Sequence, residues 1–543
     1  MIKMKNINSS FIPFLVACTC FLGLYEIYAR PGWVDSAMYL GYAMNLNLYD
    51  VHEFLQHNYQ GSRLGYIAPL HFLMENLGTF EGRLTYVVFL YSSYVFSVMI
   101  MAKYFLNTTI ERMLVCFIFI LNPGFSSSVF YGGADGPAAV QLLLAVSFLT
   151  CAIYSDGQIK KNALATLSGL FLILSVSSHI FAAIPCILIF PMLFYHFSAK
   201  RLILPLVFGI SSTLYILNVI GYQFGLDEFY LSYSIPWAKT SLFDSRGVKL
   251  VDPLGHRIRN AVFWIPIVMT ILSFRYFVPK LPSREDKNYF LILMAFINIF
   301  GPIITYSLYD ILTKGNTIVT PAYFNIIYPS FVFGLVCLVS LNIKTFGGDV
   351  SNNSVKDMKR KRYSLISILL ASVFFNFTSN HNQSALSYNN VNSESFFRSE
   401  IAFMERIKSG ELDTKKAKFI FIGMGVEDEG NPRVYRDYWK HAPRHQDYLD
   451  SLVGLLLWDR SILLRLLPED DFKIRSLNSH KNTPLVILGR NKNEVQRLAG
   501  AFQRFLSGYT SANAECYDDK YYPWCFIHFE YRKQLKDGLQ IRD

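Results

Sequence analysis

The stretch Pro137-Ala-Ala-Val-Gln-Leu-Leu-Leu-Ala-Val-Ser-Phe-Leu-Thr-Cys-Ala-Ile-Tyr-Ser155 decides the fold class, because it carries no charged residue over its whole length. A helix needs about 17–25 mainly apolar residues to cross a bilayer, and this run is long enough. Comparable runs recur along the chain and predict about eleven membrane spans. They lie near residues 11–29, 82–102, 112–131, 137–155, 162–179, 180–197, 202–223, 260–279, 288–309, 322–342 and 363–379.

The composition agrees with this interpretation. The 543 residues are 52% hydrophobic and 17% charged, and the mean hydropathy is +0.27. Soluble domains carry about 25% charged residues, so we predict a polytopic α-helical membrane protein. Much of the net charge of +11 lies in short loops between apolar runs. That placement is typical of membrane orientation and argues against nucleic-acid binding.

The basic loops predict which way the chain crosses the membrane. If the N-terminus lies inside, every inner loop carries Lys or Arg, as the positive-inside rule requires. These residues are Lys103, Arg112, Lys160, Lys161, Lys200, Arg201, Lys280, Arg284, Lys287, Lys344, Lys356, Lys359, Arg360, Lys361 and Arg362. An odd number of spans then places the C-terminal tail outside the cytoplasm. We predict a multi-pass protein of a bacterial inner membrane, although no residue decides between that membrane and the endoplasmic reticulum.

The chain is predicted to divide into a membrane domain, residues 1–379, and a soluble C-terminal domain, residues 380–543. Two apolar stretches in the tail, 418–423 and 484–489, predict buried strands, and 493–507 predicts an amphipathic helix. The tail is therefore expected to be a small α/β domain outside the cytoplasm.

Two cysteines in the tail, Cys516 and Cys525, lie close together in the sequence. Disulfides persist in oxidising compartments, so a tail outside the cytoplasm makes this pair a disulfide candidate.

The long outer loop, residues 30–81, is expected to hold two interfacial helices, Asp35–Tyr49 and Gly65–Leu77. Asp35 follows the first span directly. A carboxylate there is costly to desolvate, which favours a functional role as a general base or metal ligand. The alternative is an N-cap for a helix that begins at Ser36, and one residue can do both.

Arg63, Asp135 and His179 are further candidates at the outer face. A guanidinium matches phosphate geometry, although an interfacial arginine can also extend to lipid head groups. Asp135 lies in a glycine-rich turn before Pro137 and is a candidate for acceptor or metal binding, or simply a turn residue. His179 is a candidate proton carrier, or a hydrogen-bonded residue at a helix end.

A second outer loop, near 224–259, is basic and aromatic, against the positive-inside trend. Its cations and one from the next outer loop are candidates for binding a phosphate or pyrophosphate, with anionic lipid head groups as the alternative. They are Lys239, Arg246, Lys249, His256, Arg257, Arg259 and Lys314.

The run Asp35-Ser-Ala-Met-Tyr39-Leu-Gly-Tyr-Ala43, followed by interfacial helices and the Gly-Ser-Arg63 segment, resembles the GT-C class of membrane glycosyltransferases, especially its mannosyl- and aminoarabinose-transferases. In motif terms the resemblance covers about the first 150 residues, and elsewhere it covers architecture only. Many members have adjacent acidic residues, whereas Ser36 follows Asp35 here, which places an Asp-Glu type of metal site in doubt. Asp135 matches the place where oligosaccharyltransferase-like members supply a further acidic ligand.

The resemblance implies an inverting transfer of a hexosyl or pentosyl group from a polyprenyl-phosphate donor to a lipid, glycan or protein acceptor, as part of cell-envelope glycosylation. Asp35 would be the general base, Arg63 with His256, Arg257 and Arg259 would bind the donor phosphate, and Tyr39 and Tyr66 are further candidates. A divalent metal, Mg or Mn, is compatible with this reading but not required by it. The alternatives are a transporter or flippase for a lipid or polysaccharide, and a non-catalytic scaffold of the cell envelope.

Overall fold

The computed structural model describes residues 34–45, 61–105, 133–183, 200–226 and 228–234, a few positions between 186 and 193, and the backbone of five strands in the tail. The chain divides into two compact units. One comprises residues 1–27, 46–73 and 83–386, and the other comprises residues 28–45, 74–82 and 387–543.

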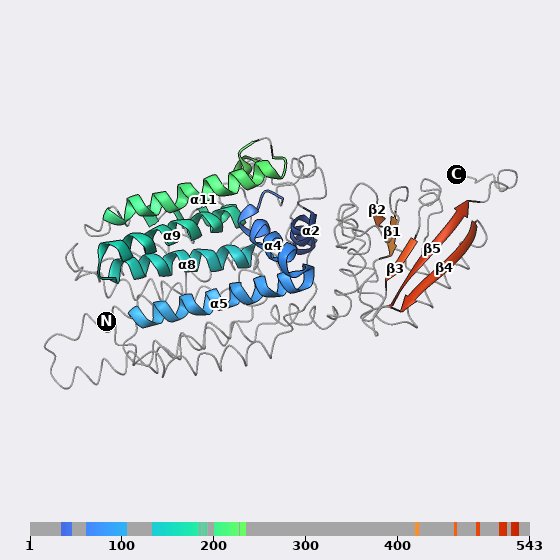
Figure 1. The fold of residues 1–543 in the computed structure, drawn as a ribbon, viewed down its shortest axis with the longest axis horizontal. Coiled ribbons are helices and arrows are strands. Elements are labelled where there is room, and N and C mark those ends of the chain that lie inside the picture. The colour runs from blue at the N-terminus through green and yellow to red at the C-terminus, as the bar shows by residue number, and fades with distance from the viewer. Residues whose placement is uncertain are drawn as a thin grey trace, which may run out of the picture. The chain divides into compact units, whose positions relative to one another are not determined.

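Four helices of the described part are long and apolar enough to cross a membrane. They are α5 (Thr79–Phe105), α8 (Asp135–Tyr154), α9 (Gln158–Ser178) and α11 (Ile203–Gln223) (Figure 1). At a rise of 1.5 Å per residue, the 20 residues of α8 extend about 30 Å, which is the thickness of the hydrocarbon core. The predictions for 82–102, 137–155, 162–179 and 202–223 are confirmed, and the chain is an integral membrane protein.

The directions of these helices agree with the predicted alternation of spans. The Ser147 hydroxyl donates to the Ser97 carbonyl at 3.3 Å, and Phe148 contacts Phe96, so α5 lies beside α8. α8 and α9 form an antiparallel hairpin, in which Ser175 donates to the Ala138 carbonyl at 2.6 Å and Ser168 to the Ala145 carbonyl at 2.7 Å.

α9 and α11 run in the same direction, because Ser177 near the end of α9 and Asn218 near the end of α11 both contact Tyr230. A parallel pair of this kind needs a connection that returns across the membrane, as the predicted span 180–197 supplies. That span is described only in part. The predictions for 11–29, 112–131, 260–279, 288–309, 322–342 and 363–379 lie outside the described residues.

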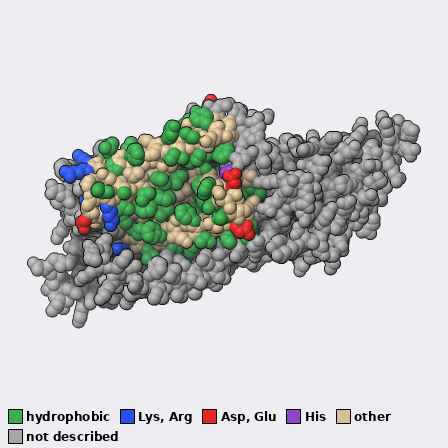
Figure 2. Space-filling view, viewed as in Figure 1, with side chains coloured by type: hydrophobic (Ala, Val, Ile, Leu, Met, Phe, Trp, Pro, Cys, Tyr) green, Lys and Arg blue, Asp and Glu red, His purple; other side chains and the backbone are tan. Residues whose placement is uncertain are grey.

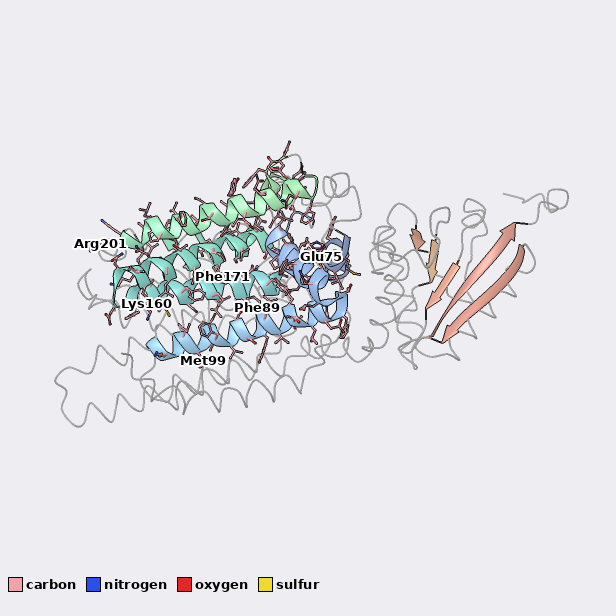
Figure 3. All side chains as sticks on the ribbon, viewed as in Figure 1. Glu75, Phe89, Met99, Lys160, Phe171 and Arg201 are labelled. Atoms are coloured by element: carbon pink, nitrogen blue, oxygen red, sulfur yellow. The ribbon has the colours of Figure 1, made fainter. Side chains whose placement is uncertain are left out.

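Basic residues gather at one end of this helical unit. Lys103 lies in the last turn of α5, Lys160 and Lys161 in the first turn of α9, and Arg201 in the 3-10 turn η3 (Lys200–Leu202) before α11. Figure 2 shows the Lys and Arg side chains grouped at that end, and Figure 3 labels Lys160 and Arg201 there. These residues share one end of the described helices, as the predicted topology requires, and the assignment of that end to the cytoplasmic side stays a prediction.

α8 is the central helix, since most of its residues are buried among the others. α9 and α11 approach closely through glycines. A Cβ on Gly169 would overlap the Leu206 carbonyl oxygen, and one on Gly209 would overlap the Thr166 carbonyl oxygen. Small residues at such crossings let membrane helices pack backbone to backbone. The outer face of α11 exposes Leu204, Phe208, Tyr215 and Ile216, as expected for a surface in contact with lipid.

Both helices predicted in the first outer loop form, and their interfacial position stays a prediction. α2 (Val34–Asn45) and α4 (Leu64–Leu77) fall close to the predicted ranges. The alternative of Asp35 as an N-cap is wrong, because α2 begins at Val34 and Asp35 lies inside its first turn. An acidic residue there still interacts favourably with the helix dipole.

The tail contains a mixed five-stranded sheet in the order β2-β1-β3-β5-β4. β1 (Phe419–Ile422) pairs in parallel with β2 (Ser461–Leu463) and β3 (Leu485–Leu488). β1 and β3 lie where strands were predicted, whereas β2 was not predicted. β4 (Thr510–Asp518) and β5 (Pro523–Tyr531) form an antiparallel hairpin whose second strand pairs with β3. The helix predicted over 493–507 lies outside the described residues.

Candidate active site at the end of the helices

The hairpin of α8 and α9 brings His179 beside Asp135. α9 ends at Ser178, and His179 caps it, with its backbone N–H donating to the Ser175 carbonyl at 2.9 Å. α8 begins at Asp135, and Pro137 lies in its first turn, where a proline costs no hydrogen bond. His179 Nε2 lies 3.2 Å from Asp135 Oδ1; the imidazole is 2% exposed and the carboxylate 22%. This pair occupies the end of the helices opposite to the lysines.

Arg63 lies near His179, whose pKa its charge affects. Arg63 is only 7% exposed, which favours a role inside the protein over an extension to lipid head groups. Its carbonyl accepts the N–H groups of Tyr66 and Ile67, both at 3.0 Å, and this starts α4. Burial, and then the charge of Arg63, lower the pKa of His179 well below its usual 6.5. The neighbouring carboxylate acts in the opposite sense, but desolvation of a fully buried imidazolium outweighs it. His179 is therefore neutral at pH 7 and donates its Nε2–H to Asp135.

Gly65 allows α4 to approach the end of α9. A Cβ at this position would overlap the Leu174 carbonyl oxygen and lie 2.8 Å from the Ser178 nitrogen. No other residue type permits that approach without moving backbone. The close contact places Arg63, two residues earlier, next to His179.

Gln141 of α8 holds this junction together. Its Nε2 donates to the Gly65 carbonyl at 3.1 Å, and its Oε1 accepts from the Ser178 hydroxyl at 2.7 Å. In a regular helix, the Gly65 carbonyl would accept from the residue four positions later. That residue is Pro69, which has no N–H. Gln141 therefore supplies the donor that Pro69 removes.

Hydroxyl groups connect the same junction to the start of the second outer loop. Ser62 contacts Ser234 at 2.8 Å, and Ser177 contacts the Tyr230 hydroxyl at 2.5 Å, next to the 3-10 turn η4 (Tyr230–Tyr233). Burial raises the pKa of Tyr230 to about 12, although the hydrogen bond from Ser177 opposes this shift. Residues 230–234, at the start of this outer loop, are therefore held at the same junction by Ser62 and Ser177.

Sequence reasoning missed a second buried guanidinium, Arg83, which is 5% exposed. It lies close to Tyr66, whose ring stacks on Tyr86 with centroids 5.7 Å apart. Burial raises the pKa of Tyr66, and the charge of Arg83 opposes that shift. An arginine within a predicted span was the available signal, since such residues are rare in membranes unless they have a function.

The structure thus brings together three predicted residues, Arg63, Asp135 and His179, with Tyr66 one turn further along α4. Asp35 and Tyr39 lie on α2, in the other compact unit, and their roles stay predictions. The remaining candidates lie outside the described residues: Lys239, Arg246, Lys249, His256, Arg257, Arg259 and Lys314.

A metal ion finds no ready site among the described residues, in which no three His, Cys, Asp or Glu side chains are grouped. Asp135 and His179 would supply only two ligands. The two side chains already interact with each other, since His179 Nε2 lies beside the Asp135 carboxylate. The side chain of Asp35 lies outside the described part, and its role as a ligand stays a prediction.

No protein-family description and no curated protein matches the chain. Among solved structures, the chain is similar to ArnT from Cupriavidus metallidurans bound to undecaprenyl phosphate, with a TM-score of 0.44 and 10% identity over 96% of this chain and 98% of that one. It is also similar to the apo state of ArnT from the same organism, with a TM-score of 0.41, 10% identity and the same coverage. At TM-scores below 0.5 and this identity, these likenesses assign neither a fold nor an activity to the chain.

Proposed function

We propose that this protein is a membrane glycosyltransferase that moves a sugar from a polyprenyl-phosphate donor to an acceptor on the extracytoplasmic side. The observation that carries the proposal is the position of Arg63. Arg63 is buried at the end of apolar helices, near His179, which in turn contacts Asp135, and at the end opposite to the lysines. A phosphate attached to a long apolar chain needs that combination of a cation at the membrane boundary and an apolar helix surface.

The proposed reaction breaks the bond between the anomeric carbon and the donor phosphate. An acceptor hydroxyl attacks that carbon from the opposite face and loses its proton to the Asp35 carboxylate, which inverts the configuration. The electron pair of the broken bond goes to the phosphate oxygen. Arg63 stabilises the charge that develops there, and a preformed guanidinium in a desolvated site is well suited to do so.

Asp135 and neutral His179 have a supporting part in this proposal. The buried imidazole holds the start of α8 against the end of α9, and the partly exposed Asp135 carboxylate is proposed to accept a hydrogen bond from a hydroxyl of the sugar or acceptor. His256, Arg257 and Arg259 are proposed to join Arg63 at the phosphate. The tail, residues 380–543, is proposed to hold the acceptor.

A transporter or flippase is the main alternative, and it calls for ionisable groups at mid-membrane depth. In the described helices the charged groups lie toward the ends instead, with the basic residues at one end and the Arg63 cluster at the other. This distribution favours chemistry at a membrane surface over passage through the membrane. The scaffold alternative has no observation in its favour among the described residues.

The test is turnover of labelled polyprenyl-phosphate sugars by the purified full-length protein, measured as released lipid phosphate. We expect wild-type protein to release it from at least one donor, and Arg63→Gln to lower kcat/KM by roughly 100-fold or more, in line with removal of one transition-state donor. Arg201→Gln is the matched control, because it removes the same charge at the other end of the helices. Equal activity of the two variants would contradict the role given to Arg63.

A further inference from the structure

The strand register places the two tail cysteines directly opposite each other. In the antiparallel pair of β4 and β5, Cys516 is the partner of Cys525. Opposite residues of such a pair have Cα atoms about 4.5 or 5.5 Å apart, depending on the hydrogen-bonding pattern. Both separations lie within the range of roughly 4.4–6.8 Å found for disulfides.

The two cysteines also share one face of the hairpin with apolar residues. Because faces alternate along a strand, the pairs Ala514–Ile527 and Ala512–Phe529 belong to the same face as the cysteine pair. That face also carries Thr510–Tyr531 and Asp518–Pro523, whereas the other face carries Ser511–Glu530, Asn513–His528, Glu515–Phe526 and Tyr517–Trp524. The two cysteines therefore occupy opposing register positions on one face of the hairpin, which is the placement that a cross-strand disulfide requires.

We propose that Cys516 and Cys525 form a cross-strand disulfide that closes the β4–β5 hairpin. In its formation the two thiols lose two protons and two electrons. The electrons reduce the disulfide of an oxidised dithiol protein to two thiols, by exchange through a mixed disulfide. Such an oxidant works in the periplasm or the endoplasmic-reticulum lumen, not in the cytosol. The bond therefore also places the tail on the extracytoplasmic side, independently of the proposed transferase activity.

The sequence around the pair makes the test direct. Trypsin cuts after Arg504, Lys520 and Arg532, so Cys516 and Cys525 fall on separate peptides, 505–520 and 521–532. Only a disulfide joins these peptides. Membranes containing the full-length protein are quenched in acid, alkylated without reductant, digested and analysed by mass spectrometry, so that thiols cannot oxidise after lysis.

We expect the two peptides to be found joined, and to take up alkylating reagent only after reduction. Cys525→Ser should expose Cys516 to alkylation, whereas Cys151→Ser, at a partly exposed cysteine of α8 far from the pair in sequence, should leave the joined peptides unchanged. Full alkylation of both cysteines before reduction, or a bond from either one to a different cysteine, overturns the proposal. Donor turnover by the same preparation is scored separately, so a negative result here leaves the transferase proposal standing.

Discussion

Replacement of Gln141 by Leu tests the junction that holds Arg63 in place. The side chain is 5% exposed and bonds the Gly65 carbonyl and the Ser178 hydroxyl. Leucine has a similar volume, so the main effect is that the Gly65 carbonyl and the Ser178 hydroxyl, both buried, lose their hydrogen bonds to Gln141. Each such group costs about 1–3 kcal/mol, which gives a loss of about 2–5 kcal/mol in the free energy of unfolding once partial relaxation is allowed for.

A second substitution isolates the Gly65 bond. Pro69→Ala restores the N–H that the helix lacks, so Gln141→Leu should be less damaging in that background, with a coupling of about 1–2 kcal/mol. The assay is equilibrium unfolding of the full-length protein in detergent micelles, followed by circular dichroism. Gln158→Leu is the matched control at an exposed position, where the hydrogen bond to Asn162 should be worth about 0.5 kcal/mol or less. A loss below about 0.5 kcal/mol for Gln141→Leu, or strict additivity with Pro69→Ala, refutes the reasoning.

Two further predictions concern the same helices. The imidazole of His179 is neutral in the folded protein, so below about pH 6.5 the unfolded chain binds a proton that the folded chain does not. The free energy of unfolding should therefore decrease by up to about 1.4 kcal/mol for each unit that the pH falls below about 6.5. Above about pH 6.5 this contribution should not change with pH. Unfolding measured at pH 5 and pH 7.5 should show this dependence in wild type and lose it in His179→Gln, and an unchanged dependence in the variant would count against a neutral, buried imidazole. Gly169→Leu should force α9 and α11 apart, because its side chain would overlap the backbone of α11. The free energy of unfolding should fall by several kcal/mol, as it does when a core is severely overpacked. The exposed change Leu167→Ala should have a much smaller effect in the same unfolding assay, and similar losses for both would show that the two helices do not pack at Gly169.

The membrane helices were predictable because the bilayer imposes a strong and local constraint. A helix in lipid must be apolar over its length, so the spans at 82–102, 137–155, 162–179 and 202–223 are visible in hydropathy alone. Charge in the loops then orders their directions, and the described helices follow that order. Strands 419–422 and 485–488 were predictable in the same way, as short apolar runs next to turn residues.

The junction around Arg63 was only partly predictable. The predicted topology places Asp135 and His179 at the same end of the helices. Whether their side chains meet depends on how far α8 and α9 are shifted along each other, which the sequence does not indicate. Gln141 was hidden inside an apolar run, and its role depends on a carbonyl 76 positions away that Pro69 leaves without a donor. Such a need arises only when α4 packs against α9, and no local pattern reports it.

Single-turnover cleavage of a bound polyprenyl-phosphate sugar by the Asp35→Asn variant tests the proposed transfer reaction. We expect the variant to bind the donor with wild-type affinity, because Arg63 is intact, while release of lipid phosphate falls by roughly 100-fold or more because the base is missing. Cleavage by Asp35→Asn at the wild-type rate, or no cleavage of any such donor by wild-type protein, would contradict the proposed reaction.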